Sequence, residues 1–259
     1  MISTVLLFWL VFLVIHHRYY WESKLPKGAN IPGNILISHR GLKYDAPENT
    51  IKAYLNAANN NFTWIEIDVL STKDGVLVCS HNYDLERETE GRGDINKLSY
   101  IDLDRRLIKD KNEKTMYHDI PRLSEVLRTI PDSIGINIEI KTSSVFDLSA
   151  SRAIMKQYSA LINRPFIITT FNPVVVIYFK MFFKEVPIGF ILESYKYLWL
   201  TNWIHPHMLI PRADMLSNEL FFYCKNKKLP ILTWTVNNPN AIIWCQNKQI
   251  IGIMTDLGK

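Results

Sequence analysis

The feature that most constrains the fold is a regular alternation of short β-type runs with helical stretches. From Ile35 onward most β-type runs lack a polar face, which is typical of strands buried in a parallel sheet. The expected strands are Ile35–His39, Trp64–Leu70, Val76–His81, Ile134–Ile140, Phe166–Thr170, Pro187–Leu192, Met208–Pro211, Leu229–Val236 and Ile250–Thr255. The expected helices are Pro47–Asn60, Pro121–Thr129, Asp147–Ile162, Pro173–Phe183, Met215–Lys227 and Pro239–Asn247. This alternation predicts an α/β fold with a parallel sheet.

Nine strands are one more than an eight-stranded (β/α) barrel needs. Only residues 71–75 separate the second and third strands, and Asp74-Gly75 is a strong hairpin signal. We therefore expect these two strands to pair as a hairpin, with one arm outside the barrel. If Asp74-Gly75 is a two-residue turn, Asp68 lies opposite His81.

Composition narrows the class of protein. The 259 residues are 47% hydrophobic and 21% charged, which excludes a disordered chain and allows one large domain or two small ones. Three cysteines without CxxC spacing exclude a disulfide scaffold and a cysteine-based zinc module. The net charge of +5 admits nucleic acid, a membrane surface or an anionic substrate, and the absence of a basic stripe or motif argues against nucleic acid.

The N-terminal segment is apolar without interruption from Val5 to Ile15 and ends in the cationic and aromatic run His16 to Trp21. This pattern favours a membrane anchor, although about 17–25 apolar residues are usual for a spanning helix. The alternative is a buried helix that covers an exposed face of the domain. Residues 1–22 are thus expected to form an apolar helix, 23–33 a linker and 34–259 the barrel. Basic residues after the helix predict a single anchor with a cytoplasmic catalytic domain.

Charged side chains gather at the carboxyl ends of the expected strands, where barrel enzymes place their reactive groups. His39-Arg40-Gly41 follows the first strand, and Glu66 and Asp68 share one face of the second. Glu139 and Lys141 share a face of a later strand. Three carboxylates meeting at one site need a cation, and oxygen ligands suit Mg²⁺ or Ca²⁺. Structural ion pairs with Arg40 and Lys141 are the alternative.

Six motifs in order make the chain resemble the glycerophosphodiester phosphodiesterases, which are TIM barrels of the phospholipase-C-like superfamily. The motifs are SHRGLKYDAPENT, WIEIDVLSTKDGVLVCSHN, NIEIK, TTFNP, LTWTVN and GIMTD. The resemblance runs from Ile35 to the C-terminus. HRG alone is a weak signal, whereas the ordered set is specific.

The resemblance implies a TIM (β/α)8 barrel that hydrolyses glycerophosphodiesters to glycerol 3-phosphate and an alcohol with one divalent metal ion, Mg²⁺ or Ca²⁺. It assigns acid/base catalysis to His39 and His81 and metal binding to Glu66, Asp68 and Glu139. It implies a small insertion at about residues 82–120. It places phosphate or substrate at six further residues: Arg40, Lys141, Glu48, Asn49, Phe171 and Trp234. The substrate is thus a small phosphodiester or a lysolipid, in glycerol and lipid metabolism.

Two departures from the family pattern stand out. Asn82 replaces the usual Asp after the second histidine, and Asp84 is near enough in sequence to compensate. The chain stops after Thr255-Asp256-Leu257-Gly258-Lys259, without the usual Pro or a final barrel helix. The second departure favours the interpretation of Val5–Ile15 as a cover for the barrel.

Two other segments have structural interpretations. His205-Pro206-His207 is expected to be a loop rather than a metal site, because no third ligand lies near it in sequence. The aromatic run Tyr195–Trp203 either holds a lipid or packs against the barrel. Two alternative functions remain open: a lysophospholipase D, and a non-catalytic, membrane-tethered barrel that binds phosphodiester headgroups. The sequence does not predict an oligomeric state.

Overall fold

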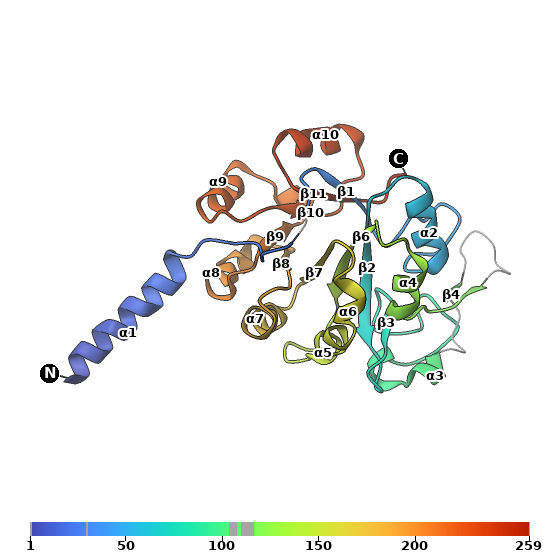
Figure 1. The fold of residues 1–259 in the computed structure, drawn as a ribbon, viewed down its shortest axis with the longest axis horizontal. Helices are drawn as coiled ribbons and strands as arrows, with labels where there is room; N and C mark the ends of the chain where they lie inside the picture. The colour runs from blue at the N-terminus through green and yellow to red at the C-terminus, as the bar shows by residue number, and fades with distance from the viewer. Residues whose placement is uncertain (1, 30, 104–107, 110–116, 259) are drawn as a thin grey trace.

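A nearly closed barrel of eight parallel strands forms the centre of the molecule (Figure 1). The computed structural model describes residues 2–29, 31–103, 108–109 and 117–258. The strands lie in the order β10-β11-β1-β2-β6-β7-β8-β9. Their bounds are β1 Ile35–Ser38, β2 Trp64–Ser71, β6 Gly135–Ile140, β7 Phe166–Thr170, β8 Ile188–Leu192, β9 Met208–Pro211, β10 Leu232–Thr233 and β11 Gly252–Thr255. Isolated parallel bridges between Leu209 and Ile231 and between Arg212 and Trp234 join β9 to β10, so the predicted barrel is confirmed in this form.

Helices follow most of the strands and surround the barrel (Figure 1). They are α2 Ile51–Asn59, α4 Leu123–Thr129, α5 Ser149–Lys156, α6 Tyr158–Leu161, α7 Pro173–Phe182, α8 Thr201–Ile204, α9 Asn218–Asn226 and α10 Pro239–Asn247. Proline at the first turn opens α7 and α10, where Asn172 and Asn238 cap the free backbone N–H groups.

The alternation along each strand creates two apolar layers. Ile65, Ile67 and Val69 of β2 belong to the large cluster between the strands and the helices. Trp64 of the same strand belongs to a smaller cluster of buried apolar side chains with Ile37 and Met254 from the neighbouring strands. Period-2 geometry therefore turns Glu66 and Asp68 to the side of Trp64, away from the helices.

The predicted hairpin between the second and third strands is present, but its predicted register is wrong. β3 (Leu77–Cys79) pairs antiparallel with β2, and the Ser80 N–H donates to Asp68 O at 3.2 Å. Asp68 therefore faces Ser80 rather than His81. The reason is the loop, in which Thr72 N–H donates to Val76 O and Gly75 has a φ of +81°. Three residues with glycine in the left-handed region close this hairpin, so the pairing shifts by one residue.

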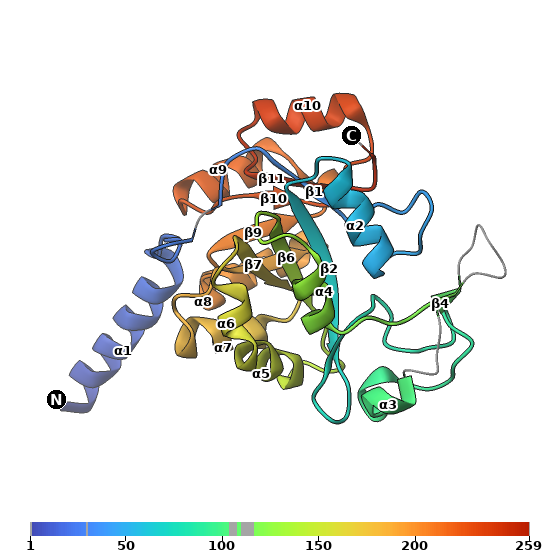
Figure 2. The same cartoon turned by 45° about the vertical axis from the view of Figure 1, so that its right-hand side comes forward.

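The insertion after β3 packs against the hairpin. It contains α3 (Tyr100–Leu103), a 3₁₀ turn at Ile95–Lys97, and the short pair β4 (Ile108–Lys109) and β5 (Tyr117–His118). Leu85, Ile95 and Leu103 are buried against Leu70 and Val78 of the two hairpin strands. The parts of the expected insertion at 104–107 and 110–116 lie outside the described residues. Figure 2 shows α3 beside the loop that joins β2 to β3.

Helix α1 (Ile2–Tyr19) extends away from the barrel (Figures 1 and 2). The side chains from Val5 to Ile15 are all exposed, so the expectation that they cover the barrel is wrong. Contacts to the barrel come from the end of α1 and the residues that follow it, where His17 Nε2 is 3.2 Å from Trp203 O and the Trp21 indole N–H donates to Asn202. Across the described residues, no helix has both the length and the apolar character to cross a membrane. The expected spanning anchor is therefore not supported.

Candidate active site

The turn after β1 brings Arg40 to the carboxyl end of the barrel. Arg40 has a φ of 59°, an uncommon conformation for a residue with a side chain. Two backbone contacts hold it there, because Arg40 N–H donates to Glu66 Oε2 at 2.9 Å and Arg40 O accepts from Asn49 N–H at 3.0 Å. Gly41 is required at the next position, since its φ is +80° and a Cβ would lie 2.7 Å from the carbonyl carbon of Ala53.

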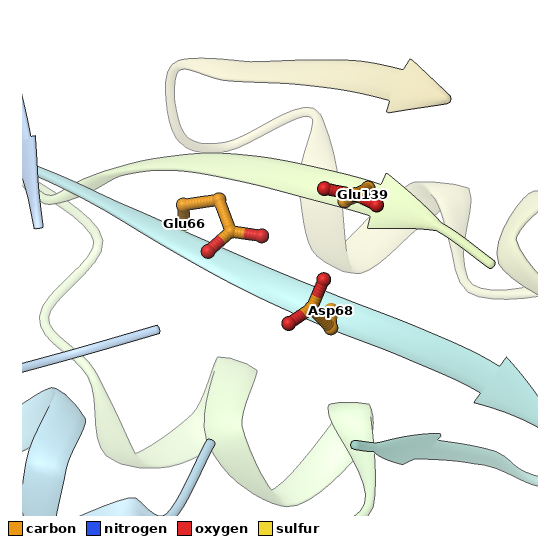
Figure 3. Close-up of side chains that lie close together, drawn as sticks. All are labelled: Glu66, Asp68 and Glu139. Atoms are coloured by element: carbon orange, nitrogen blue, oxygen red, sulfur yellow. The ribbon is translucent and has the colours of Figure 1, made fainter. Parts of the chain in front are cut away.

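Three buried carboxylates, Glu66, Asp68 and Glu139, converge at this end of the barrel (Figure 3). Asp68 of β2 and Glu139 of β6 are partners in the parallel register, and Glu66 lies two residues earlier on β2. One oxygen from each carboxylate lies within 4.8 Å of the others. The structure therefore brings together all three residues that the resemblance assigns to a metal.

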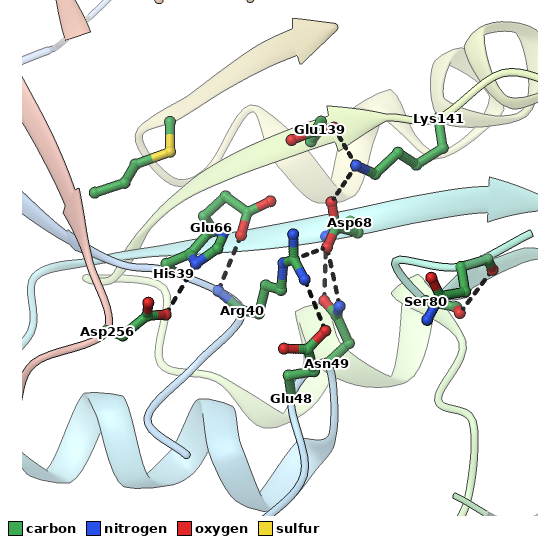
Figure 4. A network of polar contacts seen from close by, with 12 residues as sticks. His39, Arg40, Glu48, Asn49, Glu66, Asp68, Ser80, Glu139, Lys141 and Asp256 are labelled. Atoms are coloured by element: carbon green, nitrogen blue, oxygen red, sulfur yellow. Dashed lines mark hydrogen bonds and ion pairs between the residues drawn. The ribbon is translucent and has the colours of Figure 1, made fainter. Parts of the chain in front are cut away.

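Two cations surround these carboxylates (Figure 4). Arg40 Nε lies 3.1 Å from Asp68 Oδ2, and Lys141 Nζ lies 3.1 Å from Asp68 Oδ1 and also pairs with Glu139. Burial alone would raise the pKa of Asp68, but Lys141 and Arg40 hold it below its usual range. Burial, together with the neighbouring Asp68 and Glu139, raises the pKa of Glu66 well above its usual range. Three acids thus share two cations, which leaves one negative charge uncompensated if all ionise.

The donor set fits a hard divalent cation. Glu66 Oε1 is buried and has no hydrogen-bond partner among the described residues, which is costly unless a ligand completes it. Asp68 and Glu139 each direct a buried oxygen at Lys141 without hydrogen-bond geometry. Carboxylate oxygens without competing nitrogen or sulfur ligands suit Mg²⁺ or Ca²⁺. Glu66, Asp68 and Glu139 are therefore the residues that would hold the ion.

Asn49 and Glu48 support these charged groups. Asn49 Nδ2 donates to Asp68 Oδ2 at 3.0 Å, while its Oδ1 accepts from Tyr54 and from the Asp68 backbone N–H. The Glu48 carboxylate accepts from Arg40 Nη1 at 2.7 Å and is 3.7 Å from Lys43 Nζ. Both residues orient their neighbours within the network of Figure 4.

His39 is oriented by a carboxylate to which the sequence analysis assigned no role. His39 Nδ1 lies 2.9 Å from Asp256 Oδ1, and Lys43 and Asn237 also donate to Asp256. Burial would raise the pKa of Asp256, but these hydrogen bonds hold it well below its usual range. The pairing follows from the sheet, since Ser38 of β1 is the partner of Thr255 of β11. The signal was present in the GIMTD motif, although Asp256 is 217 residues from its histidine.

His81 follows β3 and lies near the same charges. Burial and the positive charge of Lys141 lower its pKa, while Asp68 opposes the shift. Asn82 donates to Glu88 Oε1 at 2.7 Å, and Asp84 pairs with Arg87. Both side chains therefore have partners within the insertion rather than a described bond to His81.

Two aromatic residues form a wall beside Lys141. The rings of Phe171 and Trp234 meet edge to face with centroids 5.6 Å apart, and Lys141 Nζ lies 5.7 Å from the Phe171 centroid. The Trp234 indole N–H donates to Ile210 O. The aromatic pair therefore forms an apolar boundary next to the cation.

The two other segments take up structural positions. The His207 backbone and ring bind β8, with Nδ1 accepting from Ile188 N–H at 3.1 Å, and burial lowers its pKa to about 3. His205 stacks on Trp21. The aromatic run Tyr195–Trp203 forms a 3₁₀ turn and α8, and Trp203 contacts the end of α1.

We predict that the affinity for a divalent metal ion decreases as the pH is lowered below 7. Burial, opposed by Lys141 and reinforced by Asp68, raises the pKa of Glu139 to about 7, so this carboxyl gains a proton as the pH falls through that value. Because a ligand must be ionised, one competing proton with a pKa of about 7 should make Ca²⁺ bind about fivefold more weakly at pH 6 than at pH 7. Calorimetry in buffers of different ionisation enthalpy measures both affinity and proton release. Equal affinity at the two pH values would contradict the prediction, and Asp214→Asn is the control for loss of a remote carboxylate.

Comparison with known proteins agrees with this geometry. Residues 39–257 match the model of the glycerophosphoryl diester phosphodiesterase family. A glycerophosphodiester phosphodiesterase of Caldanaerobacter subterraneus is 27% identical over 86% of this chain and 93% of its own length. The structure of a Thermotoga maritima glycerophosphodiester phosphodiesterase matches with a TM-score of 0.68 at 25% identity, over 86% of this chain and 94% of the other.

A further solved structure contains a reaction product. An Oleispira antarctica phosphodiesterase, in complex with the product sn-glycerol-3-phosphate, matches with a TM-score of 0.73 at 23% identity, over 86% of this chain and 93% of the other. At this identity the likeness establishes the fold. The family model covers most of the sequence and begins at His39 itself. This chain therefore belongs to the glycerophosphoryl diester phosphodiesterase family.

Proposed function

We propose that this protein hydrolyses glycerophosphodiesters to glycerol 3-phosphate and an alcohol, with a divalent metal ion and two histidines. One observation carries the proposal: a buried carboxylate triad, two cations and a carboxylate-oriented histidine meet at the carboxyl end of the barrel. Family membership supports the reaction class, and members of the family depend on a divalent metal.

Arg40 and Lys141 meet the first requirement of the reaction. A phosphodiester is an anion, so a nucleophile approaches it only when positive charge lies at its non-bridging oxygens. Arg40 and Lys141 provide fixed cations, and ion pairs with Asp68 hold both in place. A bound Mg²⁺ or Ca²⁺ would supply further positive charge there.

The two histidines would move the protons. With its Nδ1–H donated to Asp256, His39 has Nε2 free to accept a proton from the attacking hydroxyl. His81 then protonates the leaving oxygen. The resemblance implies that the neighbouring glycerol hydroxyl attacks first. A bond forms between its oxygen and phosphorus while the P–O bond to the alcohol breaks. Water opens the resulting cyclic phosphate with the proton transfers reversed.

The alternative functions have less support. The relatives named above give no support for a lysolipid substrate. The product named for the Oleispira structure is sn-glycerol-3-phosphate. A non-catalytic barrel would have no need for both histidines and all three acids at the carboxyl end of the barrel. We therefore propose a small, water-soluble phosphodiester as the substrate.

We predict that His39→Ala lowers turnover of a glycerophosphodiester by about 10²–10⁴-fold, because a positioned proton acceptor contributes about that factor. EDTA should abolish activity in the unmodified protein, and excess Mg²⁺ or Ca²⁺ should restore it. Release of glycerol 3-phosphate from glycerophosphocholine, followed by a coupled dehydrogenase assay, is the measurement. His16→Ala on α1 is the matched control, and undiminished turnover by His39→Ala would refute the mechanism.

We predict that Asp256→Asn lowers kcat by about 10–100-fold with a smaller change in KM, because the carboxylate orients His39 without contacting the substrate. The neutral amide no longer stabilises the imidazolium. Asp214→Asn, which removes an exposed carboxylate paired with Arg212, is the control. An unchanged kcat would exclude a positioning role for Asp256.

We further propose that residues 1–22 associate with a lipid surface and that the barrel of residues 34–259 lies on its cytoplasmic side. Phe8, Trp9 and the other side chains from Val5 to Ile15 are 42–68% exposed, a contiguous apolar surface that is rare on soluble monomers. Arg18 lies over the rings of Tyr19 and Trp203 at the base of the helix. Cationic and aromatic groups in this position are typical of a lipid interface.

We predict that the full chain floats with anionic lipid vesicles and that Phe8→Asp/Phe12→Asp reduces the floating fraction severalfold, since charges on the apolar surface oppose insertion. Phe146→Asp is the control, because this exposed residue lies in the loop after β6. Vesicle flotation with and without 0.5 M NaCl is the measurement. Complete release by salt, or equal loss in the control, would contradict insertion of α1.

A further inference from the structure

A small polar cavity lies between the insertion and the segment that follows β6. Its volume is about 270 Å³, and its lining comes from two segments: Tyr83, Asp94 and Asn96 of the insertion, and Thr142 and Ser143 after β6. This volume is just below the range of about 300–1,000 Å³ that holds drug-sized ligands. The cavity therefore has room for a small alcohol.

The cavity is continuous in sequence with the catalytic residues on both sides. Tyr83 lies two residues after His81, and Thr142 directly follows Lys141. The Thr142 backbone and the charges of Lys141 and Glu139 all influence the pKa of the Tyr83 hydroxyl. A phosphodiester held at Lys141 would thus place one of its two ester groups at the mouth of this cavity.

The charge of the cavity differs from that of the phosphate site. Asp94 is its only charged lining residue, and no lysine or arginine lines it among the described residues. Asp147, which is not among the lining residues, accepts from the backbone N–H of the lining residue Ser143 at 3.0 Å and from its hydroxyl at 2.7 Å. The two carboxylates make the cavity unfavourable for a second anion and favourable for a cation.

The insertion that carries Asp94 also has a net negative charge. Residues 82–120 contain ten acids and eight bases, a net charge of −2 in a chain of net charge +5. Asp94 Oδ2 pairs with Lys97, but the Lys97 side chain is 74% exposed and lies outside the cavity lining. An exposed pair of this kind is weak and leaves Asp94 able to attract a second cation.

We propose that this cavity binds the alcohol half of the substrate and selects an alkylammonium alcohol over a neutral or anionic one. Asp94 supplies the charge, and the ring of Tyr83 supplies a π-face for the ammonium group. Tyr83 follows His81 in the same loop, so the departing alcohol leaves on the side of the histidine that would protonate it. The inference rests on the proposed hydrolysis of glycerophosphodiesters and names the alcohol class that this site favours.

The experiment compares two diesters that differ in the charge of the alcohol. Glycerophosphocholine should have a kcat/KM about fivefold higher than glycerophosphoglycerol, the effect of one exposed charge contact with an aromatic contribution. Asp94→Asn should bring this ratio close to one. Asp102→Asn, which removes an exposed carboxylate from the same insertion, should keep the ratio of the unmodified protein.

The outcomes separate this inference from the proposed function. Cleavage of both diesters with equal kcat/KM, or an unchanged ratio in Asp94→Asn, would overturn the selectivity and leave the hydrolysis intact. An equal fall of the ratio in Asp102→Asn would also overturn it, since the preference would then arise from the net charge of the insertion. Cleavage of neither diester would refute the proposed function, and this inference with it.

Discussion

The balance of charge around Asp68 is the interaction on which the site depends. Asp68 is fully buried, where an isolated carboxylate would be strongly destabilised. Arg40, Lys141 and Asn49 all contact it, and each comes from a different segment of the chain. The turn after β1, the start of α2 and the end of β6 are therefore tied to β2 through one side chain. Loss of any of these partners would leave the buried charge of Asp68 incompletely compensated and would destabilise the fold.

The parallel register explains why so many charged groups tolerate one another. Pairing of Asp68 with Glu139 across β2 and β6 places two carboxylates side by side. Lys141 is two residues after Glu139, so its side chain points to the same face of the sheet. Because Lys141 pairs with both acids, the strand that adds a negative charge also adds its counter-ion. Burial, with Asp68 and Glu139 close by, still raises the pKa of Glu66 well above its usual range. The triad could therefore hold a metal ion, which would supply the missing positive charge.

Local patterns predicted most of the fold. The nine expected strands all occur, because apolar runs of four to eight residues with helical stretches between them have few other solutions. The predicted ends of the strands were less accurate, since the strand expected over Leu229–Val236 is limited to Leu232–Thr233. The hairpin register failed because a single left-handed residue, Gly75, changes the loop from two residues to three. Turn length is decided by backbone conformation, which residue identity alone does not specify.

The candidate site was predictable where spacing along one strand carries the geometry, as for Glu66 with Asp68 and Glu139 with Lys141. It was not predictable where distant segments meet. Asp256 reaches His39 only because β11 pairs with β1, at opposite ends of the barrel sequence. The position of α1 also depends on tertiary contacts: Trp21 and His17 bind α8, and the apolar residues before them remain outside the barrel.

Helix α1 and the candidate active site lie at opposite ends of the barrel. The chain after α1 is attached at the amino ends of the strands, where the Ser23 hydroxyl donates to His207 O just before β9 and Ser23 N–H donates to Lys227 O after α9. His39, Arg40 and Lys141 follow the carboxyl ends of their strands. A lipid surface bound by α1 would therefore be joined to the barrel at the end opposite the candidate active site. A substrate dissolved in water reaches such a site without leaving a membrane, whereas a lysolipid would have to leave the surface first. The attachment of α1 thus favours the same small, polar diesters as the cavity beside Tyr83.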